Sequence, residues 1–148
     1  MIPFISSLVY GPLGACQLPR TWWKMLTRNA GILDDEYPDV RDGRGLDSGV
    51  IEVLGLDRET VLGYLRDNRP TYLNFETWIL DQKGDAFFRF EQQDAIIRWN
   101  ASLRARRHTH TEKLEETYTD IDLPQDAGID SATVLNSLQD WQLFYKRD

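Results

Sequence analysis

The chain has little cysteine, little histidine and no long apolar run, and each shortage narrows the class of protein. Its single cysteine, Cys16, has no second thiol for an internal disulfide, which is typical of a protein from a reducing cytoplasm. No apolar stretch approaches the roughly 20 residues of a membrane-spanning helix, and residues 1–10 lack the basic leader of a signal peptide. We therefore expect a soluble, cytoplasmic protein that does not contact a membrane.

Positive charge is also scarce. Lysine and arginine number 17 against 24 aspartates and glutamates, which gives a net charge of −7. Such a surface repels phosphate backbones, so nucleic acid is not an expected partner. The basic cluster at residues 104–107 is short and lies at the end of an expected helix, where the helix dipole stabilises cations.

Apolar residues, in contrast, are plentiful. They make up 41% of the 148 residues and include five tryptophans. A chain of this length is expected to form one domain, residues 1–148, and to bury enough surface to need no metal or disulfide.

The spacing of these apolar residues predicts helices. Pro19 suits a first helical position and Gly31 a helix end, while Asp57 and Thr71 are natural N-caps. The helices are predicted at 19–30, 48–54, 57–68, 71–84, 86–107 and 109–118, with a last one after residue 130. The prediction is an all-α, single-domain irregular bundle of about six helices with long loops, chiefly the acidic loop 32–48.

One stretch concentrates unusual residues. Residues 11–24, G-P-L-G-A-C-Q-L-P-R-T-W-W-K, run from a glycine-bounded turn into a helix that carries Arg20 and two tryptophans. With residues 4–10 before it, this stretch resembles an uncharacterised bacterial family of short proteins that carry a domain of unknown function. Later pieces, at 55–57, 70–78 and 138–141, match in the same order.

The resemblance implies a bacterial, single-domain protein with no established activity. Its members often carry a histidine just before the Leu-Pro-Arg motif, where this chain has Gln17. If that histidine transfers protons in the relatives, Gln17 can only orient a group through hydrogen bonds.

Two residues are the main candidates for chemistry. Arg20 lies near a helix N-terminus and suits a carboxylate or phosphate ligand; alternatively it pairs with the acidic residues 34–42. Glu76 shares a helix face with Tyr72 among aromatic side chains, where a raised pKa would suit acid–base catalysis. Alternatively, Glu76 pairs with an arginine such as Arg20 or Arg69.

Weaker candidates lie elsewhere. Cys16 is expected to be a buried, inert thiol rather than a nucleophile. His108, His110 and Glu112 have spacing that invites a metal, but the chain supplies no clear third or fourth ligand, so no metal is expected. Three further residues are candidate polar anchors of a pocket: Tyr10, Tyr37 and Asp47.

These residues favour a cofactor-independent enzyme of the isomerase, lyase or cyclase type that acts on an anionic organic substrate in an aromatic-lined pocket. Glu76 and Tyr72 are its expected catalytic residues. The expected substrate-binding residues are Arg20, Gln17, Cys16, Trp22, Trp23, Trp78, Trp99 and Tyr10. A non-catalytic interaction module and a small-molecule binding protein remain open alternatives, as does a homodimer.

Overall fold

The computed structural model describes residues 1–37, 39–40, 44–108 and 111–147. These residues form seven α-helices, a 3-10 helix and no strand, which confirms the predicted all-α fold. The α-helices are α1 (Leu18–Asn29), α2 (Gly45–Val53), α3 (Arg58–Asn68), α4 (Tyr72–Lys83), α5 (Phe90–Ala105), α6 (Thr111–Asp120) and α7 (Ala132–Tyr145), and the 3-10 helix is η1 (Gly84–Phe88).

Local signals explain the ends of α3 and α4. The carboxylate of Asp57 accepts the N–H of Thr60 at the start of α3, and the hydroxyl of Thr71 accepts the N–H of Asn74 at the start of α4. Gly84 follows α4 with a positive φ of 56°, a conformation that costs glycine little. Both predicted N-caps are therefore confirmed.

Two predicted segments differ from the observed ones. The helix expected at 48–54 begins earlier, at Gly45, and the segment 86–107 is divided. Arg89 is extended with a ψ of 151°, so it separates η1 from α5. The buried ring of Phe87 lies in the main core, and we attribute the division to this tertiary contact, because no helix-breaking residue occurs there.

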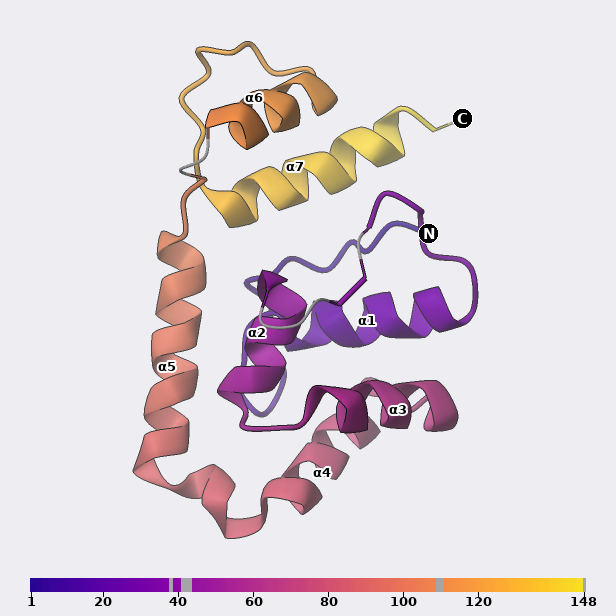
Figure 1. Cartoon of the computed structure of the whole chain (residues 1–148), viewed down its shortest axis with the longest axis vertical. Coiled ribbons are helices and arrows are strands. Elements are labelled where there is room, and N and C mark those ends of the chain that lie inside the picture. The colour runs from indigo at the N-terminus through magenta and orange to yellow at the C-terminus, as the bar shows by residue number, and fades with distance from the viewer. Residues whose placement is uncertain (38, 41–43, 109–110, 148) are drawn as a thin grey trace.

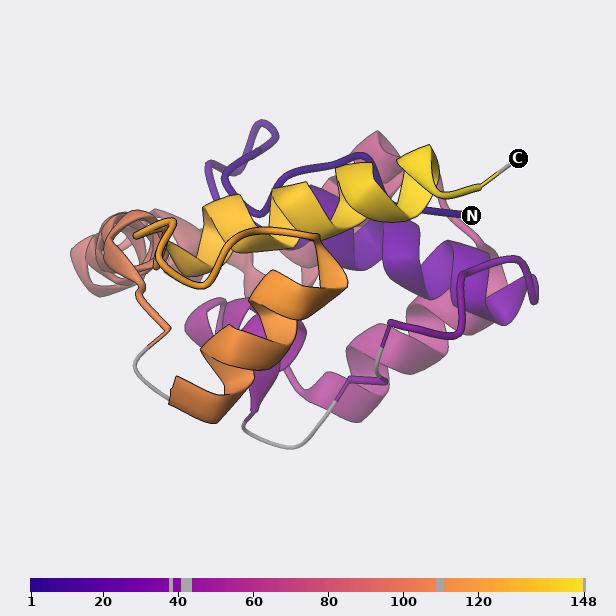
Figure 2. The same cartoon turned by 90° about the horizontal axis from the view of Figure 1, so that it is seen from above.

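The helices form two layers of unequal size. Helices α1 to α5, with η1, surround the larger core, while α6 and α7 pack together and share a smaller one (Figure 1). The larger core centres on fully buried side chains such as Leu54, Leu65, Phe75 and Ile79. Figure 2 shows α7 lying over α1, with both chain ends on the same side of the molecule.

Hydrogen bonds join residues 14–16, just before α1, to α5. Asn100 accepts the N–H of Cys16 at 2.9 Å and donates to the carbonyl of Gly14 at 2.7 Å. Trp99 donates its indole N–H to the Cys16 carbonyl at 2.9 Å. Its ring also lies so close to Gly49 that a Cβ there would be 2.6 Å away. These contacts fix where α1 begins and therefore where its polar face points.

Not every apolar residue in or beside a helix is buried. Ala30, directly after α1, is exposed. On α7, Leu135 is fully buried, but Trp141 is 58% and Tyr145 80% exposed. The apolar residues of α7 are therefore only partly directed into a core. Within the described residues, no helix is both long enough and apolar enough to span a membrane.

Candidate functional site

One helix carries both core and polar residues. Leu18 and Met25 of α1 are buried in the main core. Gln17, Arg20, Thr21 and Lys24, spaced one helical turn apart, are also buried, with exposed fractions of 6% or less. Burying so many polar groups is costly unless each finds a partner. The polar face of α1 is therefore the candidate wall of a functional site.

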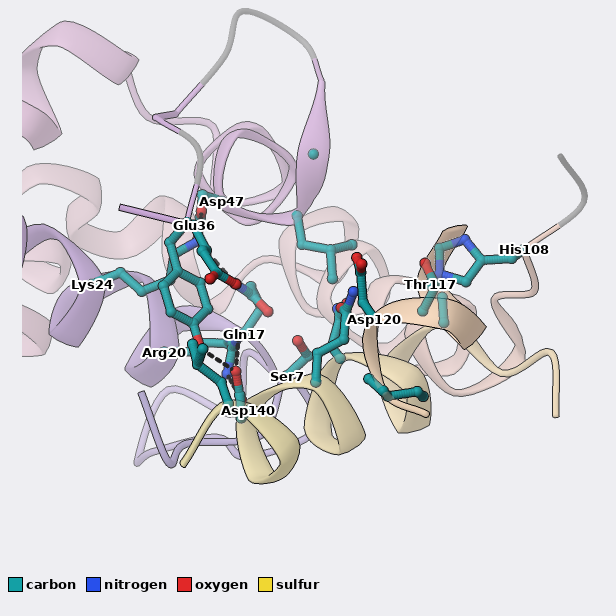
Figure 3. Close-up of a pocket in the computed structure, with 18 of the residues that line it drawn as sticks. Ser7, Gln17, Arg20, Lys24, Glu36, Asp47, His108, Thr117, Asp120 and Asp140 are labelled. Atoms are coloured by element: carbon teal, nitrogen blue, oxygen red, sulfur yellow. Dashed lines mark hydrogen bonds and ion pairs between the residues drawn. The ribbon is translucent and has the colours of Figure 1, made fainter. Parts of the chain in front are cut away.

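This face borders a cavity of about 1000 Å³ between α1 and α2 on one side and α6 and α7 on the other (Figure 3). Its lining includes Ser7, Gln17, Arg20 and Lys24 at the start of the chain, Tyr37 and Asp47 after α1, and Asn136 and Asp140 on α7. The volume lies at the upper end of the range for small-molecule pockets.

Asp47 is the shared partner of three side chains at one part of the wall. Its carboxylate lies 2.6 Å from the Lys24 ammonium, and it accepts hydrogen bonds from the Thr21 hydroxyl at 2.5 Å and the Gln17 amide at 2.9 Å. Burial alone would raise the pKa of Asp47, but the charge and hydrogen bond of Lys24, with the bonds from Thr21 and Gln17, hold it below its usual value. Asp47 therefore carries its negative charge at neutral pH.

Asp140 organises the opposite part. Arg20 donates to both of its oxygens, at 2.7 and 3.2 Å, and also to the carbonyls of Pro3 and Ile5. The Tyr37 hydroxyl donates to Asp140 at 2.6 Å, and the Arg20 guanidinium lies 5.9 Å from the centre of the Tyr37 ring. Burial, followed by the hydrogen bond and the charge of Asp140, raises the pKa of Tyr37 far above its usual range. Tyr37 therefore stays protonated.

Two residues of the lining each carry a buried polar atom that has no hydrogen-bond partner among the described residues. These atoms are the hydroxyl oxygen of Ser7 and the amide oxygen Oε1 of Gln17, in residues that are each only 2% exposed. Gln17 also has a φ of 77°, in the left-handed region that a side chain rarely adopts. A strained residue with an unmet acceptor is a mark of a functional position.

The structure does not bring Arg20 and Glu76 together. Arg20 and Gln17 line the cavity, but Glu76 and Tyr72 are not among its lining residues. Glu76 accepts the N–H of Leu13 at 2.9 Å and a short hydrogen bond from the Tyr72 hydroxyl. Burial, and then this bond, raises the pKa of Tyr72. The expected shared pocket is therefore corrected to a polar cavity that contains only the Arg20 half.

The expected ion-pair partners also differ. Arg20 pairs with Asp140 of the last helix rather than with residues 34–42. Glu76 has no ion pair with Arg20, Arg69 or any other described residue. The carboxyl of Glu76 is instead bound by the backbone N–H of Leu13 and the phenol of Tyr72.

The tryptophans pack elsewhere, and none lines the large cavity. Trp78 stacks on Tyr64 at 4.2 Å between ring centroids, and Trp22 meets the edge of Tyr72 at 5.5 Å. Trp99 packs against α2, and Trp23 borders a separate hollow of about 390 Å³ beside Phe4 and Phe144. The aromatic walls expected from the sequence therefore belong to cores and to this second hollow, because flat rings are buried more favourably against one another than against a polar face.

The remaining candidates divide in the same way. Tyr37 and Asp47 line the cavity, whereas Tyr10 is 63% exposed and lies outside it.

Cys16 is buried and also lies outside the lining. Its thiol donates to the Leu8 carbonyl at 3.3 Å, and burial raises the pKa of the thiol. His108 lines the cavity, but His110 and the side chain of Glu112 lie outside the described residues.

Sequence reasoning missed Ser7, Thr21, Asn136 and Asp140. The signal for most of them is helical spacing of polar residues. Positions 17, 20, 21 and 24 share one face of the first helix, and positions 136, 139 and 140 share one face of the last. Ser7 gives no such signal, because it lies in an irregular segment.

Neither a protein-family model, nor a curated protein, nor a solved structure shows a significant match to the chain. The resemblance to a bacterial family therefore stays a prediction. The site has to be interpreted from its own geometry.

Proposed function

We propose that the chain is a small-molecule binding protein whose ligand occupies the cavity between α1, α2, α6 and α7. One observation carries the proposal: Ser7 and Gln17, which line the cavity, each carry a buried polar atom that lacks a hydrogen-bond partner within the described part of the chain. An unmet buried polar group costs about 1–3 kcal/mol. A ligand that supplies the partner recovers that free energy on binding.

Binding has more support than proton-transfer chemistry. The pKa of Tyr37 is raised and that of Asp47 is lowered, so Tyr37 is protonated and Asp47 is charged near neutral pH. Neither group is therefore suited to exchange a proton with a substrate. The residues expected to do so, Glu76 and Tyr72, are absent from the lining. An isomerase, lyase or cyclase would need a donor and an acceptor that these four residues do not provide at the cavity.

The proposal is tested by blocking the cavity. Asn136, a half-buried lining residue on α7, is replaced by tryptophan, and Val134 on the same helix, which is 46% exposed and outside the lining, receives the matched change. Binding of a broad panel of small polar compounds is followed through the backbone and side-chain amide signals of the ¹⁵N-labelled protein. We expect compounds that shift the Gln17 signals in the unsubstituted protein and in Val134→Trp, but not in Asn136→Trp. A panel in which no compound shows this pattern overturns the proposal.

A further inference from the structure

We infer that the ligand of this cavity is an uncharged, hydroxyl-bearing molecule of the chemical class of sugars and polyols. The inference rests on the proposed function, because it concerns the same cavity. It comes from the hydrogen-bonding character of two atoms and from the distribution of charge on the wall.

The first step is the orientation of the Gln17 amide. Its nitrogen lies 2.9 Å from Asp47 and 3.3 Å from the Thr21 hydroxyl, and a carboxylate such as Asp47 can only accept. This assigns the nitrogen to the Asp47 side and leaves Oε1 as the atom without a partner among the described residues. Since Oε1 accepts hydrogen bonds only, its ligand partner must be a donor.

The second step concerns Ser7. Its buried hydroxyl both donates and accepts, and it too lacks a partner in the described segments. A ligand hydroxyl donates through its hydrogen and accepts through its oxygen. A molecule with several hydroxyl groups therefore suits both Ser7 and Gln17, whereas a carboxylate offers no donor to Gln17.

The third step is charge. The described lining residues include five cationic side chains, Arg20, Lys24, Arg44, Arg106 and Lys146, and five carboxylates, Glu36, Asp39, Asp47, Asp120 and Asp140. The two buried cations, Arg20 and Lys24, are already paired at 2.7 and 2.6 Å. A charged ligand at Arg20 or Lys24 would have to break one of these buried pairs, which is unfavourable. The anion that the sequence predicts at Arg20 is therefore not favoured there, because Asp140 already occupies that guanidinium.

The test uses three probes of matched size: glucose, which is neutral, gluconate, which is anionic, and glucosamine, which is cationic. Each is titrated into the ¹⁵N-labelled protein, with the Gln17 side-chain amide as the reporter. We expect glucose to shift these signals at the lowest concentration. Tighter binding of gluconate or glucosamine overturns the inference.

A pair of serine variants adds a second readout. Ser7→Ala is expected to weaken glucose binding about three- to tenfold, the effect of one hydrogen bond, without lowering the melting temperature. Ser6→Ala is the matched control: the Ser6 hydroxyl accepts the Leu8 N–H at 3.1 Å, so its loss should lower the melting temperature slightly and leave binding unchanged. If Ser7→Ala leaves glucose binding unchanged, water alone meets the hydroxyl and the inference is wrong.

The two proposals fail in different ways. If glucose does not bind but other panel compounds bind and are blocked by Asn136→Trp, the ligand class is wrong and the binding function stands. If no compound is blocked by Asn136→Trp, the binding function itself is wrong.

Discussion

Asp47 and Glu76 are both buried carboxylates, with 8% and 3% of their surface exposed, yet they lie in different surroundings. Asp47 is paired with Lys24 on the wall of a large cavity. Glu76 is bound by the Leu13 N–H and the Tyr72 hydroxyl, beside the glycine turn at Gly11. The aromatic residues near Glu76 on α4 pack into the main core, whereas Gln17 and Lys24, which bond Asp47 from the polar face of α1, line a cavity. For this fold, the polar helix face is the better guide to the cavity.

Breaking the Asp47 cluster should have the largest effect. Asp47→Ala leaves the Lys24 ammonium buried without its counter-charge, so we expect the free energy of unfolding in urea to fall by about 3–5 kcal/mol. Asp39→Ala is the control, because this carboxylate pairs with Arg28 while its side chain is 77% exposed; a loss of less than about 1 kcal/mol is expected there. Similar losses in the two variants would show that the Lys24–Asp47 pair is solvated.

The same cluster should respond to acid. The pKa of Asp47 is lowered in the folded state, so the unfolded chain binds more protons at this group as the pH falls through the unfolded value of about 3.9. Its contribution to stability is complete above that value and is lost as the pH falls through the lower, folded pKa. Urea unfolding between pH 6 and 3 should therefore show a shallower loss of stability in Asp47→Asn than in the unsubstituted protein.

Asp57→Asn is a reference for this measurement. Hydrogen bonds from Thr60 lower the pKa of Asp57 as well, but this group is fully exposed at an N-cap that asparagine also serves well. An equally shallow acid profile in both variants would mean that burial of Asp47 contributes nothing special.

Changing Glu76 should have the smallest effect. In Glu76→Gln the amide oxygen can accept the Leu13 N–H, and the amide nitrogen can donate to the Tyr72 oxygen, so we expect a loss of only about 1 kcal/mol. Binding of glucose at the cavity should not change. Glu76→Leu, which cannot accept the Leu13 N–H, should be clearly less stable, and equal stability of the two variants would contradict this assignment.

The helices were largely predictable because their end signals are local. Asp57 and Thr71 each bond a backbone N–H three residues away, so the sequence alone indicates where α3 and α4 begin. The division between η1 and α5 was not predictable in this way. It coincides with Phe87 in the main core, and that contact involves residues distant in the chain.

The site was predictable only in part. Gln17 and Arg20 were expected to bind a ligand, and both lie on the cavity wall, together with Tyr37 and Asp47. The partner of Arg20 could not be derived, because Asp140 is 120 positions away and no pattern in the sequence relates the two. Aromatic residues near Glu76 suggested a pocket, but a sequence does not distinguish rings that line a hollow from rings that fill a core.

The distance between Arg20 and Asp140 along the chain also has a consequence for synthesis on the ribosome, where the N-terminal part emerges first. Helices α1 to α5 supply the larger core, so this layer can assemble while α7 is still being made. Arg20 cannot pair with the Asp140 carboxylate until nearly the whole polypeptide has emerged. A nascent chain can thus form its larger core early, but the cavity is completed only when the last helix has been made.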